Sequence, residues 1–226
     1  MHSAIEQSCF DALLKIPANG VVLEGMLTIP QRVKGLVLFA HGSGSSRHSP
    51  RNNFVAQKLQ EAGIGTLLMD LLTQAEDRAY KNRFDIDLLT WRLERATQWL
   101  SELPKAQALD IGYFGASTGA AAALNAAATL GANIGAVVSR GGRPDMAMAA
   151  LDRVQSPTLL IVGSRDDAVI ELNKRAYEKI TVEKRLAIVE GATHLFEEPG
   201  SLQEVARLAA AWFTRYLGRV RRELSS

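Results

Sequence analysis

Short apolar runs alternate along the chain with longer amphipathic stretches, and this rhythm predicts the fold. The beginning differs from the rest. Asp11–Ile16 and Val21–Ile29 are predicted as two strands that meet at Asn19-Gly20, a strong signal for a tight hairpin turn. Later apolar runs such as Gly35–Ala40 show no alternation, which is typical of strands buried on both faces of a parallel sheet. The chain is therefore expected to open with an antiparallel hairpin and to continue as parallel strand–helix units.

The same rhythm continues to the end of the chain. The further predicted strands are Gly65–Met69, Ile111–Phe114, Ile134–Ser139, Thr158–Val162 and Arg185–Val189. The predicted helices are Asn52–Ala62, Asp85–Leu100, Thr118–Leu130, Val169–Ile180 and Leu202–Leu217, with a capping box expected at Ser201 and Glu204. About eight strands, right-handed crossovers and helices on both faces make an α/β fold with a mostly parallel sheet. Residues 1–226 are expected to form a single domain.

Composition and charge narrow the classes of function. The 226 residues are 47% hydrophobic and 22% charged, which suits one sizeable core, and the formal net charge is only +2. Part of the basic excess lies in a tail that is typical of a solvated helix end, and it comprises Arg215, Arg219, Arg221 and Arg222. No basic stripe is interleaved with aromatic residues, so nucleic-acid binding is not expected.

One cysteine, Cys9, precludes an internal disulfide and favours a reducing compartment. No apolar run reaches the length of a membrane span, and the first residues do not have the pattern of a signal peptide. The sequence therefore predicts a cytoplasmic protein without membrane association.

The main chemical signal is Gly115-Ala116-Ser117-Thr118-Gly119, which joins a predicted strand to a predicted helix. A serine at the tip of so tight a turn requires strained backbone geometry, and glycines two residues away on either side remove the collisions that side chains would cause there. The amides at the start of the helix point towards the serine and favour negative charge. Ser117 is therefore the predicted nucleophile.

A nucleophilic serine needs a base and an acid that orients the base. Among the four histidines, only His194 follows Ser117, and it lies between the last predicted strand and the last helix. Asp166 and Asp167 follow the strand before that. The spacing from Gly163 favours Asp166 as the acid and leaves Asp167 to cap the next helix, while Asp145 ranks third.

The oxyanion formed during attack needs backbone N–H donors. We expect one donor from Thr118 and a second from Ser43, in the loop that follows the third strand. His41, at the start of that loop, is expected to be structural.

These motifs together carry a family resemblance. Phe39-Ala40-His41-Gly42-Ser43-Gly44, the Ser117 pentapeptide, Gly163-x-x-Asp166 and Ala192-Thr193-His194 resemble the α/β-hydrolase superfamily, and the short form is similar to its dienelactone hydrolase-like group. The likeness extends over nearly the whole chain. Dienelactone hydrolases proper have a cysteine where this chain has Ser117, so the resemblance implies the fold and the triad, not dienelactone as the substrate.

The candidate substrate is small. Residues 140–157 between two strands are too few for a lid domain, which disfavours long-chain lipids. Arginines near the expected cleft, Arg47, Arg140 and Arg143, are candidates to clamp a carboxylate or phosphate, as are Arg51 and His48 nearby. The alternative is that they are solvated or paired with Asp145 and Asp152.

The sequence thus predicts a serine hydrolase that cleaves an ester, lactone or thioester of a small substrate, with an anionic substrate as one candidate, through an acyl-enzyme and with no metal and no organic cofactor. An acyltransferase or perhydrolase would use the same triad, and a non-catalytic binding protein could keep the fold. A nucleotide-binding interpretation of residues 42–46 fails because the third glycine of the dinucleotide motif and a following Gly-Lys-Ser/Thr are missing. The oligomeric state is left open.

Overall fold

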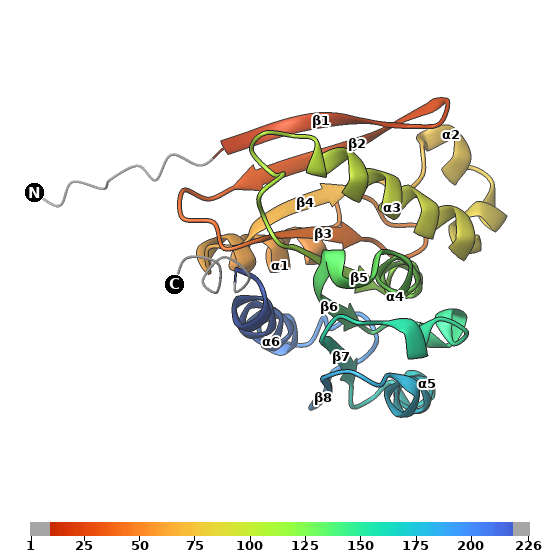
Figure 1. Cartoon of the computed structure of the whole chain (residues 1–226). Helices are drawn as coiled ribbons and strands as arrows, with labels where there is room; N and C mark the ends of the chain where they lie inside the picture. The colour runs from red at the N-terminus through yellow and green to blue at the C-terminus, as the bar shows by residue number, and fades with distance from the viewer. Residues whose placement is uncertain (1–9, 219–226) are drawn as a thin grey trace, which may run out of the picture.

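A computed structural model describes residues 10–218 and contains an eight-stranded sheet with helices on both faces (Figure 1). The strands are β1 (Phe10–Ala18), β2 (Val21–Ile29), β3 (Leu36–Ala40), β4 (Gly65–Met69), β5 (Ile111–Ala116), β6 (Ile134–Arg140), β7 (Thr158–Gly163) and β8 (Lys184–Val189). The α-helices are α1 (Pro50–Glu61), α2 (Gln74–Asp77), α3 (Ile86–Ser101), α4 (Thr118–Leu130), α5 (Asp167–Lys179) and α6 (Ser201–Tyr216). The predicted α/β class and the mostly parallel sheet are confirmed.

The sheet has the strand order β1-β2-β4-β3-β5-β6-β7-β8. β1 and β2 form the predicted antiparallel hairpin, whose turn places Asn19 and Gly20 at positive φ angles of 43° and 83°. β2 pairs antiparallel with β4, and all later pairs are parallel. The chain moves from β3 outward to β4 and then returns to the other side of β3 with β5. Such a switch in direction opens a crevice at the carboxyl ends of the strands, where ligands bind in sheets of this type.

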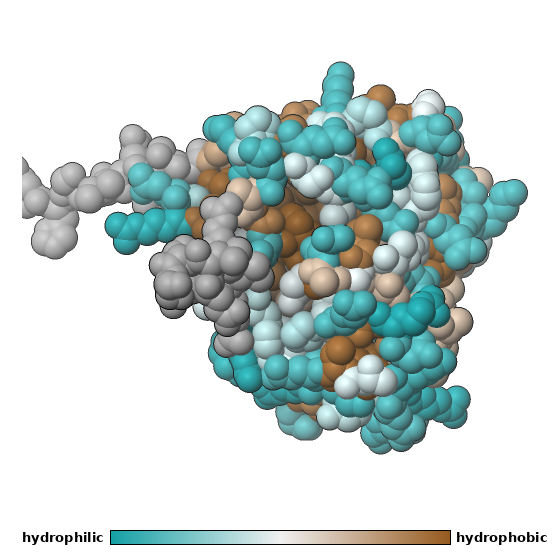
Figure 2. All heavy atoms as spheres, viewed as in Figure 1, coloured by the Kyte–Doolittle hydropathy of each residue, from teal (hydrophilic) through white to brown (hydrophobic). Residues whose placement is uncertain are grey.

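Two apolar cores lie on opposite faces of the sheet, because successive side chains of a strand point to opposite sides. Leu36 and Leu38 of β3 face the core covered by α3, α4 and α5, whereas Val37 and Phe39 face the core under α1 and α6. All five residues of β3 are buried, as expected for a strand covered on both sides. Figure 2 shows that hydrophilic residues dominate the outline of the molecule, with apolar residues visible between them.

The sequence did not predict the short helices between the longer elements. The segment after β4 contains α2 and the 3-10 helix η1 (Tyr80–Phe84), and the segment between β6 and β7 contains η3 (Pro144–Ala147) and η4 (Leu151–Arg153). Each is three to five residues long, too short to show helical periodicity.

The predicted capping box at Ser201 and Glu204 is wrong. Gly200, at φ 85°, is the residue before α6, and it makes no side-chain cap. Glu204 instead pairs with Arg207 on the surface of the same helix. Glycine accommodates the left-handed entry without strain, so the turn sets the start of α6 and not a capping side chain.

Within residues 10–218, none of the helices combines the length and the apolar character that crossing a bilayer requires. Cys9 and three of the tail arginines, Arg219, Arg221 and Arg222, lie outside the described residues. Arg215 is described, and it pairs with Glu183 at 3.0 Å between exposed side chains.

Candidate active site

Ser117 occupies a sharp turn between β5 and α4. Its backbone angles are φ 52° and ψ −122°, a region that L-residues other than glycine rarely adopt. Two hydrogen bonds hold the strained peptide in place. The Ser117 N–H donates to the Arg140 carbonyl at 3.2 Å, and the Arg143 N–H donates to the Ser117 carbonyl at 3.0 Å. The end of β6 therefore fixes the turn that presents the Ser117 side chain.

The two flanking glycines are required by close backbone contacts. A Cβ atom at Gly115 would lie 2.4 Å from the Ala120 Cα, and one at Gly119 would lie 2.1 Å from the Ala40 carbonyl oxygen. Both distances are far below any normal contact, and the neighbouring atoms are backbone atoms that cannot move aside. The sequence explanation of this motif, that glycines remove collisions, agrees with these contacts.

Asp166 and His194 come together across the carboxyl ends of β7 and β8. Asp166 Oδ2 accepts a hydrogen bond from His194 Nδ1 at 2.6 Å. The Asp166 side chain is 15% exposed and the His194 side chain 39% exposed, so the pair is shielded on the acid side and accessible on the imidazole side. A hydrogen bond at Nδ1 leaves the other ring nitrogen, Nε2, available to a reacting group.

The neighbouring acids do not make this contact. Asp167 is exposed in the first turn of α5 and makes no side-chain cap there, contrary to the role expected for it, because the residue before the helix is Asp166. Asp145, the third alternative, instead accepts two hydrogen bonds from the Arg143 guanidinium at 2.8 and 2.7 Å.

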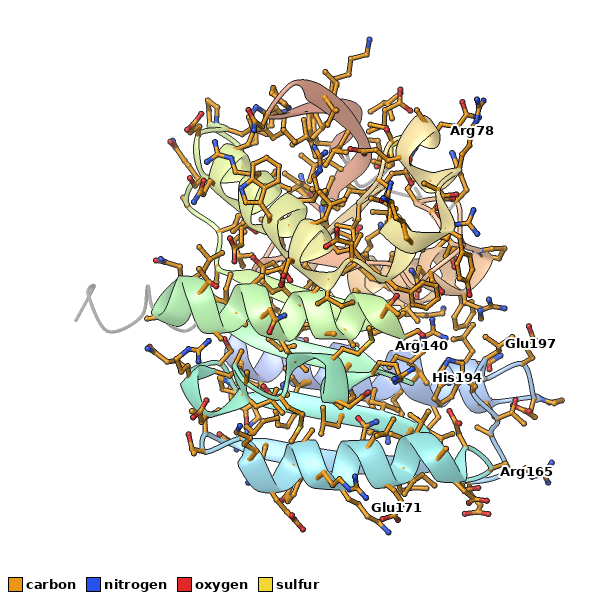
Figure 3. All side chains as sticks on the ribbon, turned by 90° about the vertical axis from the view of Figure 1, so that its right-hand side faces the viewer. Arg78, Arg140, Arg165, Glu171, His194 and Glu197 are labelled. Atoms are coloured by element: carbon orange, nitrogen blue, oxygen red, sulfur yellow. The ribbon has the colours of Figure 1, made fainter. Side chains whose placement is uncertain are left out.

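Backbone contacts hold the loops of the acid and the histidine together. The Ser164 N–H donates to the Val189 carbonyl and the Arg165 N–H to the Ala192 carbonyl, both at 2.9 Å. On its other side the His194 ring lies against the turn after β6. A Cβ at Gly141 would be 3.5 Å from His194 Cε1. Figure 3 shows His194 beside Arg140 at this edge of the sheet, with Glu197 farther out.

A cleft of about 250 Å³ opens between Ser117, the His194 loop and the start of α1. Its lining residues are Gly42, Ser43, Ser45, Ser49, Arg51, Asn52, Ala116, Ser117, Arg140, His194 and Leu195. Ser43, the predicted second oxyanion donor, is among them. Thr118, the predicted first donor, is buried at the first position of α4. Sequence reasoning missed Ser49 and Asn52, since nothing in their local pattern shows that the start of α1 would face Ser117.

His41 bridges two loops, and its ring forms hydrogen bonds to Gly42 and Leu71 and not to Ser117. It is 7% exposed, and its Nδ1 lies 3.0 Å from the Gly42 carbonyl while its Nε2 lies 3.1 Å from the Leu71 N–H. The amide must donate to Nε2, so the ring is neutral with its proton on Nδ1. Burial accordingly lowers the pKa of His41 below the ordinary 6.5. This geometry agrees with the structural role expected for it.

The three candidate substrate-binding arginines differ in their surroundings. Arg47 forms ion pairs with Asp70 and, at 2.5 Å, with Glu24, and it lines a neighbouring cavity and not the Ser117 cleft. Arg143 pairs with Asp145, as in the alternative considered from the sequence. Arg140 lines the Ser117 cleft, and no carboxylate of the described residues pairs with it. Within residues 10–218, no cluster of His, Cys, Asp and Glu side chains is arranged to hold a metal ion.

Comparisons with known proteins agree with this architecture. Residues 33–209 match the family described as the alpha/beta hydrolase domain. The crystal structure of a dienelactone hydrolase from Anabaena variabilis is 54% identical, covers 92% of this chain and 99% of its own, and superposes with a TM-score of 0.90. Est1E from Butyrivibrio proteoclasticus shares the fold alone, with 16% identity, a TM-score of 0.78, and coverage of 90% of this chain and 98% of its own.

A longer relative carries a different name. A Mycobacterium tuberculosis (strain H37Rv) protein with the provisional name phosphoribosyl transferase is 55% identical over 217 residues, which is 96% of this chain and 49% of the relative. The chain thus spans about half the length of the curated relatives it matches. With most of its length matched by the hydrolase family, and with a nearly full-length dienelactone hydrolase structure as a relative, the chain belongs to the α/β-hydrolase family as a dienelactone hydrolase-like member.

Proposed function

We propose that this protein is a serine hydrolase that cleaves the ester, lactone or thioester bond of a small substrate through an acyl-enzyme on Ser117. The observation that carries the proposal is the convergence of three groups. A serine in strained elbow geometry shares a cleft with a histidine whose Nδ1 is held 2.6 Å from a carboxylate. This constellation activates a serine for nucleophilic attack.

In the proposed reaction, Ser117 Oγ attacks the carbonyl carbon while His194 Nε2 takes the hydroxyl proton. Asp166 keeps the other imidazole nitrogen protonated and stabilises the imidazolium that forms. The N–H groups of Thr118 and Ser43 are the proposed donors to the oxyanion. The imidazolium then protonates the leaving alcohol or thiol as the carbonyl reforms. Water, deprotonated by His194, attacks the acyl-enzyme and releases the acid, which regenerates Ser117.

The family match supports a hydrolase for this chain. The phosphoribosyl transferase name belongs to relatives about twice as long, and residues 33–209 of the present chain match the hydrolase family. An acyltransferase or perhydrolase remains the alternative within the same chemistry, since the acceptor that reaches the acyl-enzyme decides between them. A non-catalytic binding protein is the alternative outside it.

The test is covalent labelling with a fluorophosphonate probe beside Ser117→Ala, with the adduct located by mass spectrometry. We expect labelling at Ser117 that is absent from the variant, and a loss of ester turnover of roughly 10⁴- to 10⁶-fold in that variant. A folded wild-type protein that is not labelled would support the non-catalytic alternative. Labelling together with faster product formation when alcohol or hydrogen peroxide is added would favour acyl transfer or perhydrolysis.

A further inference from the structure

Arg140 is a buried cation that faces the candidate reaction centre. It ends β6, is 7% exposed and lines the cleft that contains Ser117 and His194. Its Nη2 lies 3.5 Å from Asn52 Oδ1, at the limit of a hydrogen bond, and its Nε has no hydrogen-bond partner among the described residues. The guanidinium carbon lies 5.8 Å from the centre of the Phe196 ring, a weak cation–π contact. Its local partners therefore leave the charge largely uncompensated.

Other arginines of the same protein show what a compensated cation looks like here. Arg92, which is also buried and whose Nε likewise has no hydrogen-bond partner among the described residues, donates to Glu76 at 2.7 Å and to the Ala18 carbonyl at 2.7 Å, so a carboxylate balances its charge. Arg143, only three positions from Arg140, holds Asp145 through two hydrogen bonds. Burial of a charge without a partner is strongly unfavourable. An unpaired guanidinium that lines a cleft is thus a feature that an incoming anion would satisfy.

A second cation strengthens this interpretation. Arg51, in the first turn of α1, lines the same cleft, and its side chain is 34% exposed. It pairs through Nη1 with Glu197, whose side chain is 63% exposed, while its buried Nε has no hydrogen-bond partner among the described residues. Burial, and then the nearby charge of Arg51, lowers the pKa of Arg140 to about 10, so the Arg140 guanidinium stays positive at neutral pH.

The remaining walls of the cleft also favour a negatively charged group of the substrate. The start of α1 faces it, and a helix N-terminus has positive potential. Ser49 Oγ already accepts the Asn52 N–H at 3.3 Å, so this helix contributes its dipole more than free amides. Ser45 adds a hydroxyl from the loop after β3. In a volume of about 250 Å³ these groups surround the space beside Ser117.

We propose that Arg140 and Arg51 form an anion-binding subsite, separate from the oxyanion donors Thr118 and Ser43, that binds a carboxylate or phosphate group carried by the ester substrate. The inference rests on the proposed function, because it assigns the substrate class of the Ser117 site. Guanidinium groups match the planar, two-oxygen geometry of these anions. Binding of the remote anion places the ester carbonyl against Ser117, so the subsite is expected to act mainly on kcat/KM for charged esters.

The test compares matched esters. Methyl butyrate is paired with monomethyl succinate, which carries a carboxylate, and 2-methoxyethyl acetate is paired with 2-acetoxyethyl phosphate. We expect wild-type kcat/KM to be higher for at least one charged ester than for its neutral partner by roughly 10- to 100-fold, the effect of charged hydrogen bonds. Arg140→Gln should remove this preference, read within the variant as the ratio of kcat/KM for the charged ester to kcat/KM for its neutral partner, so that a general loss of turnover does not count. The charged ester that is preferred identifies the anion as carboxylate or phosphate.

Two further variants keep the test decisive if Arg140→Gln does not fold. Arg51 lies at the rim of the cleft, so Arg51→Gln should reduce the preference for charged esters in part. Arg207→Gln, which changes an exposed arginine paired with Glu204 on α6, should leave the preference unchanged. Equal kcat/KM for charged and neutral esters in the wild type overturns the proposal. So does a loss of the preference for charged esters in Arg207→Gln as large as that in the Arg140 or Arg51 variant.

A binding measurement separates this proposal from the proposed function. Calorimetric titration of the Ser117→Ala protein with inorganic phosphate and with succinate needs no turnover. We expect saturable binding of at least one of them, weakened roughly tenfold or more in Ser117→Ala/Arg51→Gln. If this binding occurs while the wild type resists the fluorophosphonate, the hydrolase proposal fails and the subsite stands. If labelling succeeds but neither anion binds, the subsite fails alone.

Discussion

Asp166 and Asp167 are neighbours in the chain with different surroundings. Asp166 accepts the His194 Nδ1 hydrogen bond, whereas Asp167 is exposed in the first turn of α5. An asparagine at 166 would present an amide that can also donate, which favours the wrong imidazole tautomer. We expect Asp166→Asn to lower kcat for a small ester by about 10⁴-fold. Asp167→Asn should stay within about twofold of wild type, because exposed side chains away from the site contribute little.

Steady-state kinetics of both variants on one neutral ester check this assignment, with circular dichroism as the control for folding. A large loss in Asp167→Asn with a small loss in Asp166→Asn would contradict it. A neutral ester is the right choice, because its turnover does not depend on the proposed Arg140 subsite.

At the residue scale, the sequence indicated which residues belong to the candidate triad better than it indicated how the nearby arginines are paired. Ser117, Asp166 and His194 were predicted from motif and chain order, and the structure places Asp166 beside His194 and His194 in the Ser117 cleft. The three arginines could not be ranked, because the pairing of Arg47 depends on Asp70 and Glu24, which are distant in the chain. Charge compensation is a tertiary property, and a local pattern does not contain it.

At the element scale, the junction of β5 and α4 gives a sharp prediction about Gly119. Replacing glycine by alanine within a helix normally stabilises a protein by up to about 1 kcal/mol. Here the added Cβ would lie 2.1 Å from the Ala40 carbonyl oxygen and 2.5 Å from that of His41. We therefore expect the opposite sign, a loss of roughly 1–3 kcal/mol in the free energy of unfolding.

Urea unfolding of Gly119→Ala measures this effect, and Gly191→Ala is the matched control. Gly191 has φ 73°, and no atom lies within 4 Å of the position that an added methyl group would take. Its substitution therefore brings only backbone strain, about 1–2 kcal/mol. Stabilisation by Gly119→Ala would show that the close approach of α4 to β3 is not maintained in solution.

The long elements were predictable because each has a strong period or a fully buried run, as in β3 and α3. The missed α2 has a capping box, with Thr73 and Glu76 satisfying each other's backbone amides, but it spans only four residues. A capping signature without a following amphipathic stretch does not identify a helix. Conversely, Ser201 and Glu204 have the spacing of a capping box, yet the turn at Gly200 decides the start of α6.

At the scale of the whole molecule, the strand order brings the candidate groups together. Ser117 follows β5, Arg140 ends β6, Asp166 follows β7 and His194 follows β8, and these four strands are parallel neighbours. Their carboxyl ends therefore meet at one edge, beside the crevice between β3 and β5 where the chain reverses its direction across the sheet. Residues 141–157, between β6 and β7, contain two short 3-10 helices, so this connection leaves the edge uncovered by a lid domain.

The same edge depends on His41 for a contact between two of its loops, and this links the stability of the fold to pH. Burial lowers the folded-state pKa of His41 below 6.5, the ordinary value that applies in the unfolded chain. At a pH between the folded-state and the unfolded-state pKa, the unfolded chain therefore binds more protons than the folded protein. The stabilisation is fully present above about pH 6.5 and is lost as the pH falls through the folded-state pKa. Protonation at Nε2 would also break the hydrogen bond from the Leu71 N–H.

We therefore expect the unfolding free energy of the wild type to decrease from pH 7 towards pH 5, and His41→Gln to flatten part of this slope. His48→Gln is the matched control, since His48 is exposed and its loss should leave the slope as it is. Urea titrations at several pH values measure all three slopes. Equal slopes in the wild type and His41→Gln would mean that the ring is not held neutral, and that the bridge between the loops after β3 and β4 does not stabilise the folded state.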